Sequence, residues 1–152
     1  MERIVALARR HDCYLLSDEI YIGSELDGVK TTSFLGLYEK AIVASGLAKS
    51  LSHPGLRIGW LAGPREFIDG SWHHHDYTTI STGIISQYVA NVILQPQKRQ
   101  EVLERGRRLL RANVPIVQDW VDAHGGNFHM VPRGPGEWPL YAITWISIQV
   151  NW

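Results

Sequence analysis

The sequence predicts an α/β fold, because short apolar runs that suit buried strands alternate with longer segments of helical periodicity. Residues 14–16 and 41–44 are runs of the first kind, and residues 58–62 are expected to form another strand. Ahead of the first run, apolar residues recur at helical spacing up to about Arg10. This pattern predicts an amphipathic helix that covers the sheet.

The second half of the chain is predicted to be mainly helical. Pro64 suits the first turn of a helix that runs to about Trp72. Ser81 is expected to cap a further helix, which Pro96 interrupts. A long helix is then expected over residues 97–124.

Proline and glycine are expected to interrupt and to end the predicted long helix. Pro115 should kink the long helix, and Gly125-Gly126 should end it. Beyond it, residues 128–131 are expected to form a short strand. Residues 144–150 alternate between apolar and polar side chains, which predicts a half-buried strand.

Composition excludes several classes of function. The chain has 152 residues, of which 45% are hydrophobic and 20% charged, as in ordinary soluble globular proteins. Lysine and arginine together number 15 and are balanced by 15 acidic residues, which argues against charge-driven binding to nucleic acid or to a membrane surface. No apolar run reaches the roughly 20 residues of a membrane span.

The number of cysteines indicates the redox state of the compartment in which the protein works. Cys13 is the one cysteine, so an internal disulfide is excluded and a reducing, cytoplasmic environment is expected. The thiol is predicted to behave as a small buried hydrophobe.

Residues 45–60 carry the first chemical pattern. Lys49 lies among small residues, and Arg57 follows eight positions later. Small residues let a planar ring approach the backbone closely, and a partly desolvated lysine can attack a carbonyl to form a Schiff base. Arginine offers a rigid fork of donors that matches a phosphate. An aldehyde that carries a phosphate is pyridoxal phosphate (PLP).

A second pattern lies upstream, in Asp18-Glu19-Ile20-Tyr21. Asp18 follows the first predicted strand, and open α/β sheets place ligands at the carboxyl ends of their strands. A PLP ring needs a carboxylate beside its pyridine nitrogen. Tyr21 lies three residues on and could donate its hydroxyl to the phenolic oxygen of the ring.

Together, Asp18-Glu19-Ile20-Tyr21 and residues 45–60 closely resemble the class I/II aminotransferases, which are PLP-dependent enzymes of fold type I. The resemblance extends over about residues 1–131 and is to the middle and later part of such enzymes, so the chain is expected to be a fragment. It implies part of the α/β/α sandwich of the aspartate aminotransferase-like large domain, followed by the start of the small α+β C-terminal domain. Residues 1–96 would belong to the PLP-binding large domain, and residues 97–152 would form the interdomain helix and the start of the small domain.

The resemblance also implies a role for each residue of the site. Lys49 would be the catalytic Schiff-base lysine, Asp18 the partner of the pyridine nitrogen, Tyr21 the partner of the phenolic oxygen, and Arg57 the partner of the phosphate. Many relatives have serine or threonine at the position of Gly46, where it helps to hold the phosphate. Ser45 is therefore a further candidate for cofactor binding.

The implied activity is transfer of an amino group between an amino acid and a 2-oxo acid, by a cytoplasmic homodimer in the full-length family. Two alternatives stay open. Another fold type I PLP enzyme, such as a carbon–sulfur lyase or a decarboxylating synthase, would share the residues that build the cofactor site. A truncated, non-catalytic remnant would keep them without activity.

Two other clusters have plainer interpretations. Residues 73–75 are consecutive histidines, which point in different directions and seldom bind one ion, so a polar loop is expected there rather than a zinc site. Five arginines of the predicted long helix are expected on a solvated face, because acidic residues accompany them and the net charge is zero. They are Arg99, Arg105, Arg107, Arg108 and Arg111.

Overall fold

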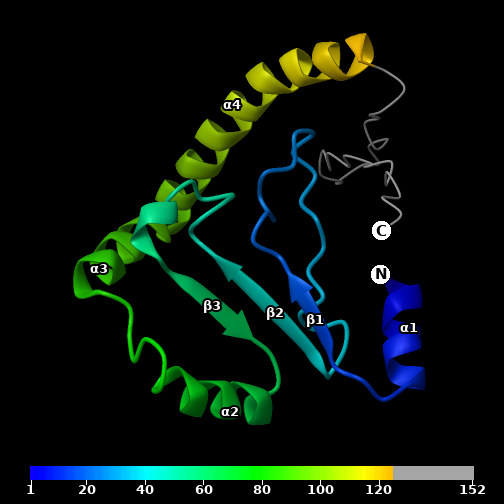
Figure 1. Ribbon diagram of the computed structural model, residues 1–152, viewed down its shortest axis with the longest axis vertical. Coiled ribbons are helices and arrows are strands. Elements are labelled where there is room, and N and C mark those ends of the chain that lie inside the picture. The colour runs from blue at the N-terminus through cyan, green and yellow to red at the C-terminus, as the bar shows by residue number, and fades with distance from the viewer. Residues whose placement is uncertain (125–152) are drawn as a thin grey trace, which may run out of the picture.

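A computed structural model describes residues 1–124 of the chain as a mixed α/β structure, which confirms the predicted class. Figure 1 shows a small twisted sheet, with α1 beside one edge and the long α4 running past the other side of the molecule. The strands are β1 (Leu15–Asp18), β2 (Ala41–Gly46) and β3 (Gly59–Ala62), and the helices are α1 (Glu2–Arg10), α2 (Arg65–His75), α3 (Ile84–Ile93) and α4 (Pro96–Ala123), with a short 3₁₀ helix, η1, over Pro54–Leu56.

The sheet has the order β1-β2-β3. β1 and β2 are parallel, with Asp18 opposite Ala44, whereas β2 and β3 are antiparallel, with Gly46 opposite Gly59. The carboxyl ends of β1 and β2 therefore meet at one edge of the sheet. Two segments leave this edge: residues 19–40, called the first loop here, and residues 47–58, called the second loop.

Glycine is required where β2 meets β3. A Cβ atom at Gly46 would lie 2.7 Å from the carbonyl oxygen of Ile58 and 3.0 Å from the Cα of Gly59. Both neighbours are backbone atoms, so neither can move away by a change of side-chain rotamer. Gly46, where many relatives have serine or threonine, therefore lies where the backbones of β2 and β3 approach each other closely.

Two groups of buried side chains stabilise the described part of the chain. The first joins the second loop to the two later helices and contains Leu47, Leu51, Ala90, Ile93 and Leu103. The second joins α1 to the segment that enters β2 and contains Val5, Ala8, Tyr38 and Ala41. α1 therefore lies beside the β1 edge of the sheet and packs on the segment that enters β2, rather than covering a face of the sheet as expected.

Several local expectations need correction. α3 begins at Ile84 after Gly83, so Ser81 is not its cap; Ile80, with a φ of 61°, turns the chain just before it. The three consecutive histidines lie in the last turn of α2 rather than in a loop. Cys13, which follows a turn in which Asp12 has a φ of 49°, is exposed rather than buried.

α4 continues through Pro115 without ending, and Figure 1 shows its axis curving along the later part. The glycine pair after it and the strands expected over 128–131 and 144–150 lie outside the described residues. The domain boundary near residue 96 coincides with the start of α4 and stays a prediction. Within residues 1–124, no helix is long and apolar enough to cross a membrane, and no three potential metal ligands cluster.

Candidate active site

Asp18 is the last residue of β1, and its side chain is exposed at the edge where both loops begin. Its Oδ1 accepts a hydrogen bond of 3.1 Å from the backbone amide of Ile20. This short turn is a common use of aspartate after a strand. It fixes the direction in which the chain leaves β1 and so places Tyr21.

Tyr21 and Lys49 come together from the two loops. The Nζ atom of Lys49 lies 5.9 Å from the centroid of the Tyr21 ring, within the range of a cation–π contact. The loops are also joined by their backbones, because the Ser50 amide donates to the Ile20 carbonyl at 3.4 Å. Lys49 is exposed in the described structure, in contrast to the desolvated setting that favours a neutral amine.

Ser45 lies near the end of β2, and its hydroxyl is already engaged. Its Oγ donates to the backbone carbonyl of Glu19 at 3.3 Å. The amide of Glu19 in turn donates to Ala44 at 2.8 Å. In this structure the Ser45 hydroxyl ties β2 to the first loop, and its role as a phosphate contact stays a prediction.

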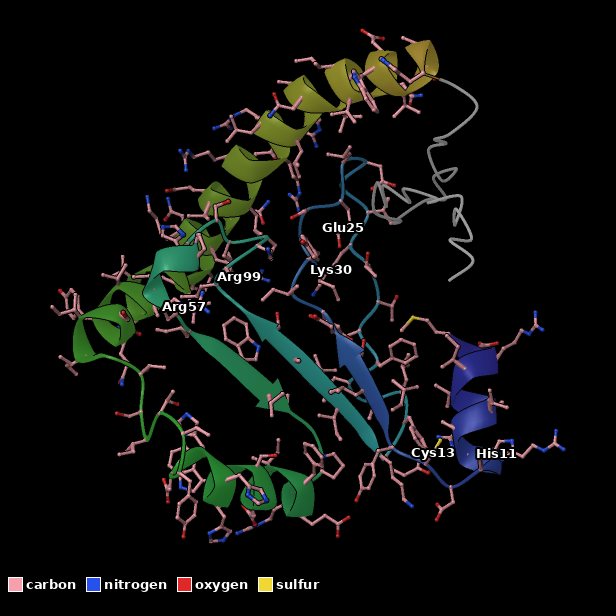
Figure 2. All side chains as sticks on the ribbon, viewed as in Figure 1. His11, Cys13, Glu25, Lys30, Arg57 and Arg99 are labelled. Atoms are coloured by element: carbon pink, nitrogen blue, oxygen red, sulfur yellow. The ribbon has the colours of Figure 1, made fainter. Side chains whose placement is uncertain are left out.

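Arg57 lies at the far end of the second loop, just after η1. It has a left-handed backbone, with a φ of 54° and a ψ of 42°. Its Nη1 donates to the Pro54 carbonyl at 3.0 Å, and the side chain is exposed. Figure 2 shows Arg57 toward α3 and the start of α4, away from the first loop.

A cavity of about 190 Å³ lies beside the carboxyl end of β1. Its walls include Asp18 and Tyr21, together with Thr31, Thr32 and Phe34 of the first loop. Ser45, Lys49 and Arg57 do not line it. The structure therefore brings Asp18 and Tyr21 to one hollow and Lys49 to the ring of Tyr21, whereas Arg57 stands apart.

Glu25, which no sequence motif marks, is fully buried in the first loop. Its Oε1 accepts hydrogen bonds of 3.0 Å from the amides of Gly23 and Thr31, and its Oε2 lies 4.0 Å from Nη2 of Arg107 on α4. Arg107 is thus not on a solvated face as expected; its side chain is 11% exposed. Its spacing of four residues from the apolar Leu103 was the signal that could have revealed this.

The sequence and fold are similar to known aminotransferases. The family model for "Aminotransferase class I and II" matches residues 1–130. The chain is 28% identical over 143 residues to aromatic-amino-acid aminotransferase 2 of Thermococcus litoralis, covering 88% of this chain and 37% of that protein. It is likewise 28% identical to an aspartate aminotransferase of Pyrococcus abyssi, again covering 88% of this chain and 37% of that protein.

Solved structures agree. A PLP-dependent aminotransferase from Streptococcus suis matches with a TM-score of 0.70 and 36% identity, covering 80% of this chain and 32% of that one. A variant aspartate aminotransferase of Thermus thermophilus matches with a TM-score of 0.74 and 28% identity, covering 86% of this chain and 34% of that one. The chain spans about a third of the length of these relatives. With an aspartate aminotransferase-like fold and a family match over most of its length, the chain belongs to the class I and II aminotransferases.

Proposed function

We propose that this chain is the lysine-bearing part of a PLP-dependent aminotransferase, which moves an amino group between an amino acid and a 2-oxo acid. The observation that carries the proposal is the meeting of Lys49 with the Tyr21 ring at 5.9 Å. Asp18, at the end of the neighbouring parallel strand, lines a cavity together with Tyr21. Relatives that act on aspartate and on aromatic amino acids support a proteinogenic amino acid as substrate.

The side chains present fit PLP by their chemistry. The amine of Lys49 makes no hydrogen bond or ion pair with any residue in 1–124 and is exposed, so it is available to a carbonyl. One carboxylate oxygen of Asp18 accepts a hydrogen bond from the Ile20 amide, and the second oxygen is available to accept one from a ring nitrogen. Arg57 uses one donor on Pro54 and has others for a phosphate.

When bound, PLP supplies an electron sink for the charge that develops on the substrate α-carbon. Lys49 Nζ would hold the cofactor and would serve as the base for the proton of that carbon. The Asp18 carboxylate would keep a proton on the ring nitrogen, and the Tyr21 hydroxyl would donate to the phenolic oxygen. The Arg57 guanidinium would pair with the phosphate.

We further propose that the working protein is a homodimer. The segment around α3 exposes large apolar side chains in succession, with Ile84 and Ile85 each 77% exposed and Tyr88 73% exposed. Contiguous exposed apolar surface of this kind is typical of protein–protein contacts. A second copy of the chain would cover it.

Covalent trapping tests the proposed anchor. The chain has four lysines, Lys30, Lys40, Lys49 and Lys98. Borohydride reduction of the protein with PLP, followed by peptide mapping, should place the label on Lys49. Lys49→Ala should abolish trapping, and the control Lys98→Ala should leave it unchanged. Label on Lys30 or Lys40 with none on Lys49 would overturn the assignment.

A further inference from the structure

One face of α4 contacts both loops that leave the carboxyl edge of the sheet. It is made of Leu103, Gly106, Arg107 and Arg111, which lie at helical spacing and are called the α4 contact face here. The first loop carries Tyr21, and the second carries Lys49. α4 is therefore placed to set where the two loops stand relative to each other.

Toward the first loop, the contact face binds two consecutive residues. Arg107 faces the carboxylate of Glu25 at 4.0 Å, and Arg111 Nε donates to the carbonyl of Leu26 at 3.0 Å. Gly23 completes the contact, because a Cβ at that position would lie 2.8 Å from Cδ2 of Leu103. Figure 2 shows Glu25 on the first loop, in the direction of the middle of α4.

The buried side chain of Glu25 links two separate parts of the first loop by hydrogen bonds. Its Oε1 accepts from the amides of Gly23 and Thr31, so it spans the loop. Burial raises the pKa of Glu25, but hydrogen bonds from the amides of Thr31, Gly23 and Glu25 itself, and from the Thr31 side chain, outweigh this and hold the pKa below its ordinary value. Arg107 is the cation that lies against this carboxylate, with its Nη2 4.0 Å from Oε2 of Glu25, while its Nη1 donates to Glu104 at 3.4 Å.

Toward the second loop, the contact is apolar and close. Leu103 packs in one buried cluster with Leu47 and Leu51, which flank Lys49 in the sequence. Gly106 brings the helix backbone near the loop, since a Cβ there would lie 3.7 Å from the carbonyl oxygen of Ser50. The same turns of α4 therefore touch the residues on either side of Lys49.

We propose that Glu25 and Arg107 are positioning residues of the active site, which hold the first loop against α4 and so place Tyr21 opposite Lys49. The inference rests on the proposed function for its catalytic meaning. Neither residue touches the cavity directly. Glu25 acts through Thr31, whose amide donates to it and which is among the residues that line the cavity with Asp18 and Tyr21.

The matched pair of variants is Arg107→Met and Arg108→Met. Both remove one arginine and one tryptic site from α4, but Arg108 is exposed and Arg107 faces Glu25. The first readout is tryptic cleavage after Lys30, in the first loop. We expect cleavage about tenfold faster in Arg107→Met, because a buried carboxylate without its partner opens the loop. Arg108→Met should cleave at the wild-type rate.

The second readout reports the place of Lys49 without needing the cofactor. Lysines are dimethylated with ¹³C and observed by NMR, and the resonance missing in Lys49→Ala is assigned to Lys49. In the wild type the Tyr21 ring should shift this resonance away from those of the other lysines. The shift should be lost in Arg107→Met and kept in Arg108→Met. Arg107→Lys, which restores a cation, should recover most of it.

Wild-type cleavage after Lys30 together with an unchanged Lys49 resonance in Arg107→Met would overturn the proposal. If circular dichroism shows that Arg107→Met is unfolded, Glu25→Gln replaces it, since it keeps the shape and the acceptor while removing the charge. The same two readouts then decide. Absence of PLP trapping at Lys49 in the wild type would overturn the proposed function instead, and neither readout here depends on it.

Discussion

At the scale of single residues, Gly46 leaves no room for a side chain between β2 and β3. A Cβ there would lie 2.7 Å from the Ile58 carbonyl oxygen. We predict that Gly46→Ala lowers the free energy of unfolding by about 1–3 kcal/mol, the usual cost of forcing extra atoms into a packed site. Gly55→Ala is the control, because nothing lies within 4 Å of a Cβ at Gly55. Equal urea midpoints for the two variants would contradict the prediction.

Glu25 gives the chain a pH-dependent stability of known sign. Its pKa is lower in the folded protein than the ordinary value of 4.5, so its contribution is present above that value and is lost as the pH falls through the folded pKa. We predict that the stability difference between wild type and Glu25→Gln is constant near neutral pH and shrinks below about pH 4.5.

Urea unfolding at a series of pH values measures this difference. Glu2→Gln, at an exposed position, is the control and should change stability by less than about 0.5 kcal/mol at each pH. A difference between wild type and Glu25→Gln that does not vary with pH would show that the pKa of Glu25 is the same in the folded and unfolded protein.

The residue scale also shows what a sequence can and cannot reveal of a site. Asp18 and Lys49 could be proposed as site residues because each lies at or after the end of an apolar run in a recognisable motif. Glu25 could not, because its burial depends on a helix that begins some seventy positions later in the chain. Burial is the usual state of a lone cysteine, but Cys13 lies exposed between α1 and β1, with its Sγ 3.8 Å from the Ala8 carbonyl oxygen.

At the scale of elements, Leu103 is the most deeply buried apolar side chain of α4. Leu103 is 3% exposed and packs against the second loop and α3, whereas Leu109, on the same helix, is 55% exposed. We predict that Leu103→Ala lowers the free energy of unfolding by about 2–5 kcal/mol, because it removes buried methyl groups and leaves a cavity.

The matched control is Leu109→Ala, which should cost less than about 1 kcal/mol because its side chain is already in water. Thermal unfolding followed by circular dichroism distinguishes the two. A loss of similar size for both variants would indicate that intrinsic helix propensity, rather than packing on the second loop, sets the stability of α4.

Most elements could be predicted because their patterns are local. Apolar runs located the strands, and helical spacing located α1 and α4 to within a residue or two. The start of α3 was misplaced because Ser81 has the chemistry of a cap, but the turn at Ile80 directs the chain so that the helix begins only after Gly83. α2 extends through the three histidines after Trp72, because no proline or glycine interrupts the helix there.

At the scale of the whole molecule, the exposed segment around α3 predicts self-association. We expect Ile85→Asp to raise the dissociation constant of the homodimer at least about tenfold, because a charge would be buried against apolar side chains of the second copy. Ile116→Asp is the control: Ile116 is 66% exposed on α4, outside this segment. Sedimentation velocity measures both, and a wild-type chain that sediments as a monomer would refute the prediction.

The antiparallel pairing of β2 with β3 has a consequence for the order of folding. The Leu47 amide donates to Ile58 at 3.0 Å, so the Lys49 segment closes on itself between neighbouring strands. Such short-range closure takes far less time than joining a parallel strand across a long connection. In pulse-labelled hydrogen exchange, the Leu47 amide should therefore gain protection before the Glu19 amide, which donates to Ala44. During refolding, the segment that carries Lys49 would then be in place before β1 pairs with β2 and brings Asp18 to the same edge of the sheet.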